Sequence, residues 1–142
     1  NEVTDRLIDA IKSKKYDFIV VNYANGDMVG HSGNMKAAIE AVKTLDIAIE
    51  RISKAVNDEN GFLIITADHG NVEYMFDEAN NTPHTSHTLN PVPLVLVAND
   101  LYKSKIKLDK GTLSDIAPLV LKLMNIDKPK EMTGNALIKD KL

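Results

Sequence analysis

Carboxylate and imidazole side chains gather in this sequence where runs of apolar residues end. Asp68 and His69 directly follow one such run, and Asp27 and His31 follow an earlier one. Gly70 permits a sharp turn after the later pair, so that two adjacent side chains can reach one site. Because ligands bind beyond the carboxyl ends of strands in open α/β sheets, we expect both pairs to line one crevice.

These groups, together with a histidine-rich loop at 82–88, predict a metal site. Imidazoles and carboxylates suit manganese, zinc or magnesium. The candidates are too many for one tetrahedral ion with an open position and too few for two complete sites, so we expect one site filled from this chain and a second half built. Two ions roughly 3.5 to 4 Å apart would hold the attacking and leaving oxygens of a phosphoryl transfer. The candidate ligands are Asp27, His31, Asp68, His69 and His87.

Each of these residues also has an ordinary structural explanation when taken alone. A single histidine is commonly a hydrogen-bonded polar group, and an aspartate beside a histidine at a strand end can cap the next turn. His84 lies in an irregular loop, and we expect it to stand outside the site. We expect Ser32 to start a helix and Ser86 to position the loop, rather than to act as nucleophiles.

Hydrophobic periodicity predicts an α/β domain that positions these residues. The order strand, helix, strand is typical of a right-handed parallel crossover, so we expect a three-layer fold with a mostly parallel sheet and helices on both faces. The chain 1–142 is expected to be a single domain. Helices are predicted at 3–15, from 32–34 to 56, and at 113–124 with Thr112 or Ser114 as cap, and strands at 16–23, 62–67 and 93–98, with an edge piece at 106–108.

The composition excludes several classes of protein. With 44% hydrophobic residues in 142, the chain can build a core. A net charge of −3 and a pI near 5.8 offer no basic field for nucleic acid or anionic lipid. The absence of cysteine excludes disulfides and thiolate metal sites. No apolar run approaches the ~20 residues that cross a bilayer, and no leader precedes the domain, so we expect a cytoplasmic protein.

Four sequence motifs resemble the C-terminal part of the cofactor-independent (2,3-bisphosphoglycerate-independent) phosphoglycerate mutases, which are members of the alkaline phosphatase superfamily. Asp-His-Gly alone would indicate only the superfamily, whereas the combination, in order and spacing, is specific to the mutases. The motifs are Asn25-Gly26-Asp27-Met28-Val29-Gly30-His31-Ser32-Gly33-Asn34, Thr66-Ala67-Asp68-His69-Gly70-Asn71, His87-Thr88-Leu89-Asn90-Pro91-Val92-Pro93 and Pro129-Lys130-Glu131-Met132-Thr133-Gly134.

The resemblance implies a fold of the alkaline phosphatase type and a glycolytic enzyme, expected to be monomeric when intact, that interconverts 3-phosphoglycerate and 2-phosphoglycerate through a phosphoserine. It implies two manganese ions, with magnesium or zinc as alternatives. Asp27, His31 and His87 would bind one ion, and Asp68 and His69 would belong to the shell of the other.

The resemblance also places the nucleophilic serine, an aspartate of the second ion and most substrate-binding arginines in segments outside this one. We therefore expect the chain to be the C-terminal portion of a mutase, to need the N-terminal part of that protein as its partner, and to be inactive alone. We expect apolar surface left uncovered to promote self-association. The alternatives are another member of the superfamily, such as a phosphopentomutase or a phosphatase, or a stand-alone metal-binding domain.

Overall fold

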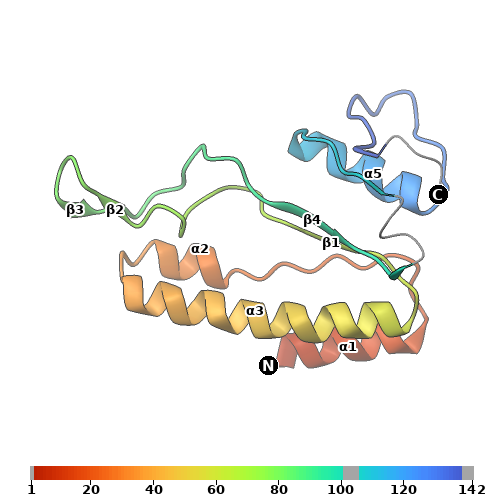
Figure 1. Ribbon diagram of the computed structural model, residues 1–142, viewed down its shortest axis with the longest axis horizontal. Coiled ribbons are helices and arrows are strands. Elements are labelled where there is room, and N and C mark those ends of the chain that lie inside the picture. The colour runs from red at the N-terminus through yellow and green to blue at the C-terminus, as the bar shows by residue number, and fades with distance from the viewer. Residues whose placement is uncertain (1, 101–105, 139–142) are drawn as a thin grey trace.

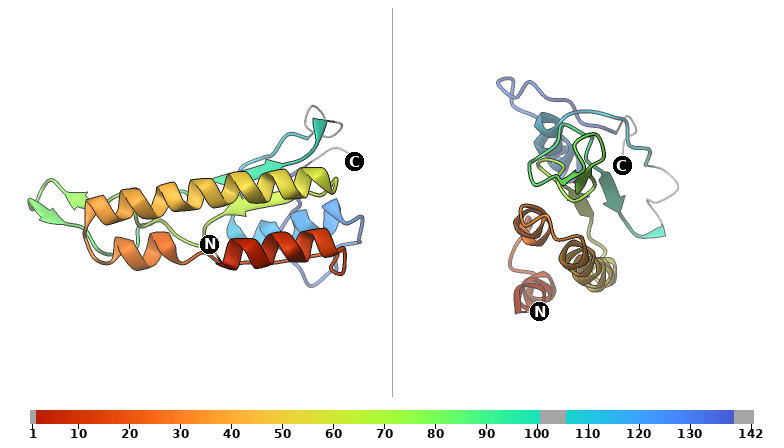
Figure 2. Two further views of the ribbon diagram at one scale, coloured as in Figure 1. Left: turned by 90° about the horizontal axis from the view of Figure 1, so that it is seen from below. Right: turned by 90° about the vertical axis from the view of Figure 1, so that its left-hand side faces the viewer.

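The structure is a computed structural model that describes residues 2–100 and 106–138. Helices lie on both sides of a thin middle layer of extended chain (Figures 1 and 2). Helices α1 (Glu2–Ser13) and α3 (Met35–Asp58) cover one side. On the other side lies α5 (Ile116–Leu123), which follows the short 3-10 helix η1 (Leu113–Asp115). This layering confirms the expected α/β class.

Helix α3 is the longest element, and its buried face is built mainly from small residues. Asn34 occupies the N-cap, where its side chain accepts a hydrogen bond of 3.1 Å from the backbone N–H of Ala37. Ser32, expected to start the helix, is not the N-cap. Its hydroxyl donates to the carbonyl of Val29 at 2.6 Å and accepts the backbone N–H of Asn34 at 3.2 Å. Small side chains let α1 and α2 (Asn25–Gly30) pack closely against α3. The buried residues of α3 are Ala38, Ala41, Ala48, Ile52, Ala55 and Val56.

The two central strands pair antiparallel, which corrects the parallel pairing expected in the sheet. Strand β1 (Leu63–Thr66) pairs with β4 (Leu94–Val97) along its whole length. Parallel neighbours need a crossover, usually a helix, between them. The connection from β1 to β4 contains only a small hairpin, β2 (Phe76–Asp77) and β3 (Thr82–Pro83), and the chain therefore returns in the opposite direction.

The segment 16–23 is extended, but the prediction that it forms a strand is wrong. Within the described ranges, no backbone hydrogen bond joins it to another segment. Its β-branched and aromatic residues suit a pleated surface, but a strand also requires a hydrogen-bonded neighbour. The expected edge piece at 106–108 likewise has no strand structure. The segment 16–23 runs in the same direction as β1, from the right of Figure 1 toward α2.

The C-terminal helical region contains two of the most completely buried side chains of the described residues. Leu119 is 0% exposed, and Pro118 beside it is also fully buried. Thr112, one of the two expected caps, precedes η1 and donates its backbone N–H to Asp115 at 2.7 Å. Asp115 also accepts the backbone N–H of Asn135 at 2.7 Å, which ties the C-terminal segment to the start of this region.

None of the helices within residues 2–100 and 106–138 has the length and apolar character required to cross a membrane.

Candidate metal centre

Asp27 and His31 face the same way because they lie one helical turn apart. Residues 25–30 form the short helix α2, with His31 as its C-cap. Residues four apart on a helix lie one above the other, so the carboxylate and the imidazole converge. The Asp27 Oδ1 to His31 Nε2 distance is 3.1 Å.

His87 completes this cluster from a loop sixty residues further along the chain. Its Nε2 lies 2.9 Å from Asp27 Oδ1 and 3.1 Å from His31 Nε2. These three residues form the one group of potential metal ligands found among the described residues. The structure therefore brings together the three residues that the family resemblance assigned to one ion.

The ring of His31 is oriented by the histidine loop. Its Nδ1 lies 2.7 Å from the backbone carbonyl of Thr85. A carbonyl only accepts, so Nδ1 donates its proton to Thr85, and Nε2 is the ring nitrogen that faces Asp27 and His87. Metal-binding histidines are held in this way, with the other ring nitrogen donating to a carbonyl or carboxylate. One carboxylate oxygen and two imidazole nitrogens are suitable ligands for manganese or zinc.

The second predicted pair lies at the margin of this cluster. The His69 ring stacks on that of His87, with centroids 3.6 Å apart and an interplanar angle of 16°. His69 Nε2 is 3.8 Å from Asp27 Oδ1 and 3.7 Å from Asp68 Oδ1. The Asp68 side chain is mostly exposed. His69 thus adjoins the three-residue cluster, while the exposed Asp68 side chain lies beside it.

Asn71 positions Asp27, and sequence reasoning gave it no role. It is 5% exposed, and its side-chain amide donates to Asp27 Oδ1 at 3.2 Å. Burial acts to raise the pKa of Asp27, but the hydrogen bonds from Asn71 and His87 outweigh it and hold that pKa below its usual value. Asp27 is therefore kept as a carboxylate. The sequence signal for Asn71 is its place at the end of the motif Thr66-Ala67-Asp68-His69-Gly70-Asn71, two residues after His69.

Gly30 is required for this contact. A Cβ at position 30 would overlap the side-chain amide oxygen of Asn71. Gly26, in the same helix, has no such neighbour, because a Cβ there would lie 4.0 Å from the nearest atom, a methyl of Val72. The two glycines of α2 thus differ sharply in the space around them.

A second hydrogen-bond network holds the histidine loop beside the end of β1. Glu73 accepts from the hydroxyl of Thr88, from the side chain of Asn90 at 3.0 Å and from the backbone N–H of Asn71 at 2.6 Å. Partial burial opposes ionisation, yet these hydrogen bonds lower the pKa of Glu73. A bridge between Gly70 and Thr88 adds a backbone contact. This network fixes the segment that carries His87, and the sequence analysis missed it because its members are far apart in the chain.

His84 lies outside the cluster of Asp27, His31 and His87. Its ring packs edge-on against Tyr74, with centroids 4.8 Å apart. Its backbone N–H donates to the carbonyl of Met75 at 2.9 Å. These contacts are those of a residue that shapes the loop.

Comparison with known proteins gives the same class of site. Residues 1–128 match the family model described as the metalloenzyme superfamily, and the chain belongs to that superfamily. Its fold is that of the phosphoglycerate mutases of the alkaline phosphatase type. A structure of Leishmania mexicana phosphoglycerate mutase at low cobalt concentration superposes with a TM-score of 0.84 at 31% identity, over 97% of this chain and 28% of that one.

Two curated relatives of the chain carry the name of the same enzyme. The chain is 55% identical over 137 residues to a 2,3-bisphosphoglycerate-independent phosphoglycerate mutase of Ehrlichia ruminantium (strain Gardel). It is 51% identical over 137 residues to the enzyme of that name from Pseudomonas syringae pv. tomato. In both comparisons 96% of this chain is covered, and the chain spans about a quarter of the relative's length, 27% and 26% respectively.

Proposed function

We propose that the chain is the C-terminal portion of the metal-binding, phosphatase-like domain of a cytoplasmic, glycolytic phosphoglycerate mutase. One observation supports this most directly: Asp27, His31 and His87 converge on one point in a chain similar to such mutases over nearly its full length. The intact protein would interconvert 3-phosphoglycerate and 2-phosphoglycerate through a phosphoserine.

The residues of the cluster fit a divalent ion. Asp27, His31 and His87 would hold one manganese ion, and Asp68 and His69 would contribute to the shell of a second. Bound divalent ions would neutralise charge on the phosphoryl group as it moves between oxygens. The rest of the network prepares these ligands: the Thr85 carbonyl fixes the tautomer of His31, and Asn71 keeps Asp27 ionised and in place.

We further propose that residues 1–142 alone do not turn over phosphoglycerate. Phosphoryl transfer depends on the positioning of the nucleophile, the ions and the substrate together. The family resemblance assigns the nucleophilic serine, the remaining ligands of the second ion and most substrate-binding arginines to other parts of the protein. The chain would thus supply one assembled ion site and half of another.

The test is phosphorus NMR of 3-phosphoglycerate incubated either with the isolated chain or with the full-length protein that contains it, here called the parent. The parent is expected to be a monomer. We expect interconversion only with the parent. His87→Ala in the parent should lower the rate at least ~100-fold by removing a ligand, whereas His84→Ala, in the same loop, should change it little. Turnover by the chain alone would contradict the inactivity.

Two other results would replace the proposed function. A parent that prefers phosphopentoses or simple phosphate esters would be another member of the superfamily. A parent without any of these activities that still binds one ion at Asp27, His31 and His87 would be a metal-binding protein.

A further inference from the structure

Two segments far apart in the sequence carry three of the five proposed ligands. The segment 68–71 follows β1 and carries two of them, and the segment 87–90 precedes β4 and carries His87. Both segments lie between the β1–β4 pair and the β2–β3 hairpin (Figure 1). Their backbones meet at a bridge, where the N–H of Thr88 donates to the carbonyl of Gly70 at 2.9 Å. A bridge of this kind does not by itself fix the angle between two segments.

The side chain of Glu73 joins the two segments a second time. Its Oε1 accepts hydrogen bonds from the hydroxyl of Thr88 and from the side-chain amide of Asn90 at 3.0 Å. Its Oε2 accepts the backbone N–H of Asn71 at 2.6 Å. The two oxygens of one carboxylate therefore hold both segments at once.

These contacts require a carboxylate at position 73. The Thr88 hydroxyl accepts the backbone N–H of Asn90 at 3.3 Å, which leaves its own proton to be donated to Glu73. Partial burial alone would raise the pKa of Glu73, but the hydrogen bonds from Thr88 and Asn90 outweigh it and lower that pKa. A glutamine has only one acceptor oxygen, so in either orientation its NH₂ group would face at least one N–H or O–H donor.

The backbone of Gly70 leaves the space that this network occupies. A Cβ at position 70 would overlap Oε1 of Glu73 and the hydroxyl of Thr88. The missing side chain therefore lets Glu73 reach Thr88 directly beside the bridge. The glycine of the Asp-His-Gly motif thus has a packing role in addition to the turn that it permits.

One ring from each segment takes part in the stack described above. The centroids of His69 and His87 are 3.6 Å apart, with an interplanar angle of 16°. Stacking at this distance depends on the placement of one segment against the other. We propose that Glu73 is a positioning residue, whose carboxylate holds 68–71 against 87–90 and thereby sets the placement of His69 relative to His87.

This inference rests on the proposed function, which assigns the two histidines to the shells of different ions. Glu73 is not a member of the cluster of potential ligands formed by Asp27, His31 and His87. It would act through Thr88 and Asn71, in the way that outer hydrogen-bond partners orient metal ligands. The carboxylate would thus keep the ligands of the two ions in one arrangement before either ion binds.

The test compares two variants of the parent. Glu73→Gln changes the proposed positioning residue, and Glu78→Gln changes an exposed glutamate in the turn of the β2–β3 hairpin. In the metal-free protein, NMR of labelled histidines measures the nuclear Overhauser effect (NOE) between the rings of His69 and His87. We expect this NOE in the unmodified parent and in Glu78→Gln, and its loss in Glu73→Gln. Calorimetric titration should show that Glu73→Gln binds manganese ~10- to 100-fold more weakly.

Thr88→Val tests whether the carboxylate acts through the hydroxyl beside His87. It removes one donor and should weaken both the ring NOE and manganese binding. The double variant should bind manganese about as weakly as Glu73→Gln alone, because both substitutions remove the same contact. If Glu73→Gln does not fold, the loss of the ring NOE in Thr88→Val carries the test.

A purely structural role of Glu73 would give a different result. Glu73→Gln would then lower the urea midpoint but leave the ring NOE and the manganese affinity of the folded protein unchanged, which would overturn the inference. Equal losses in Glu78→Gln, or additive losses in the double variant, would also overturn it. Because the NOE is measured without metal, a parent that shows it but neither binds manganese nor turns over phosphoglycerate would contradict the proposed function and not the positioning role.

Discussion

At the residue scale, the site depends as much on the residues that hold the ligands as on the ligands themselves. Asp27 is fixed by Asn71, His31 by the Thr85 carbonyl, and the loop that carries His87 by Glu73. Each of these contacts joins segments far apart in the sequence. Preorganised ligands lose little conformational freedom when they bind an ion. The network therefore lowers the entropic cost of metal binding.

The two glycines of α2 test the role of Asn71. Gly30→Ala should push the Asn71 amide away from Asp27, cost about 1–3 kcal/mol of stability through overpacking and weaken manganese binding about 10- to 100-fold. Gly26→Ala gains the same helix propensity without the overlap and should stabilise the fold by about 0.5–1 kcal/mol. Urea denaturation and calorimetric titration of both variants measure these effects. Equal behaviour of the two variants would show that the contact between Gly30 and Asn71 is unimportant.

The sequence was sufficient to find the candidate ligands that converge in the structure, but not the residues that support them. Asp27, His31 and His87 belong to motifs in which residue type and spacing reflect the chemistry directly. Asn71 is a common residue type, and its contact with Asp27 spans 44 positions. Glu73 likewise meets Thr88 only because the chain folds back on itself. Contacts of this kind follow from the tertiary fold and have no local pattern.

At the element scale, the helices were predicted more successfully than the strands. Helices α1 and α3 follow the 3.6-residue spacing of their apolar residues, and α3 ends at Asp58, close to the predicted end at 56. Helical hydrogen bonds are local, so a single segment determines them. Strands need a partner. Segment 16–23 has the composition of a strand but pairs with no other segment of residues 2–100 and 106–138, and β4 pairs antiparallel because no crossover helix lies between it and β1.

Asp115 links the start of the C-terminal helical region to the segment around Asn135, and its ionisation should make stability depend on pH. Hydrogen bonds from the backbone of Asn135 and Thr112 lower its pKa in the folded protein. Its stabilising effect is therefore complete above the unfolded pKa of about 3.9 and is lost as the pH falls through the lower, folded-state value.

Asp115→Asn should lower the urea midpoint at pH 7, and the difference from the unmodified chain should shrink as the pH approaches 3. Asp127→Asn replaces an exposed aspartate of the same region and serves as the control, with little effect at either pH. A stability difference between Asp115→Asn and the unmodified chain that does not change with pH would contradict the assigned role of the carboxylate.

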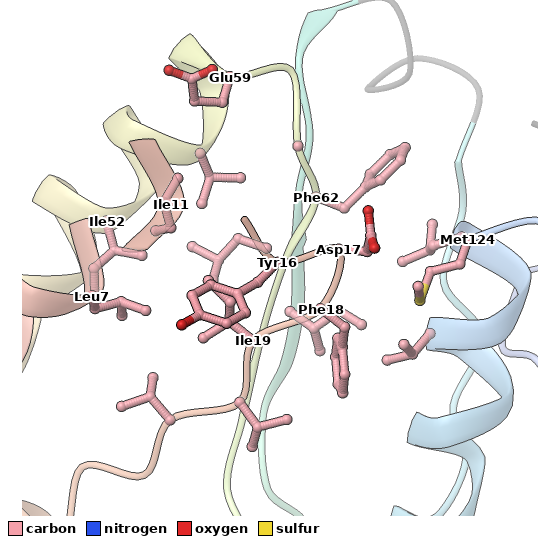
Figure 3. A pocket seen from close by; sticks show the side chains of 18 of the residues that line it. Leu7, Ile11, Tyr16, Asp17, Phe18, Ile19, Ile52, Glu59, Phe62 and Met124 are labelled. Atoms are coloured by element: carbon pink, nitrogen blue, oxygen red, sulfur yellow. The ribbon is translucent and has the colours of Figure 1, made fainter. Parts of the chain in front are cut away.

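At the scale of the whole molecule, helices cover both faces of a middle layer of extended chain (Figure 2). Within the described residues this layer contains one pair of central strands, and an apolar slot of about 670 Å³ lies between 16–21 and β1 (Figure 3). Exposed apolar residues such as Val20 and Phe18 are contiguous with the slot. The sequence predicted uncovered apolar surface but could not locate it, because its position depends on which edges remain unpaired.

The exposed slot should cause weak self-association of the isolated chain. Analytical ultracentrifugation should show a mean mass that rises with concentration, and Val20→Asp should reduce this rise, because a charge disfavours burial of the slot. Ile47→Asp changes an exposed residue of α3 that does not line the slot, and should have a smaller effect. A chain that stays strictly monomeric at high concentration would argue against an accessible apolar slot.

The central claim is that Asp27, His31 and His87 form a metal site within this chain. Calorimetric titration with manganese of the unmodified chain, of His87→Ala and of His84→Ala tests it most directly. We predict one ion per chain for the unmodified protein and for His84→Ala, and loss of that binding in His87→Ala. Equal manganese binding by all three proteins, or none by the unmodified chain, would contradict the claim.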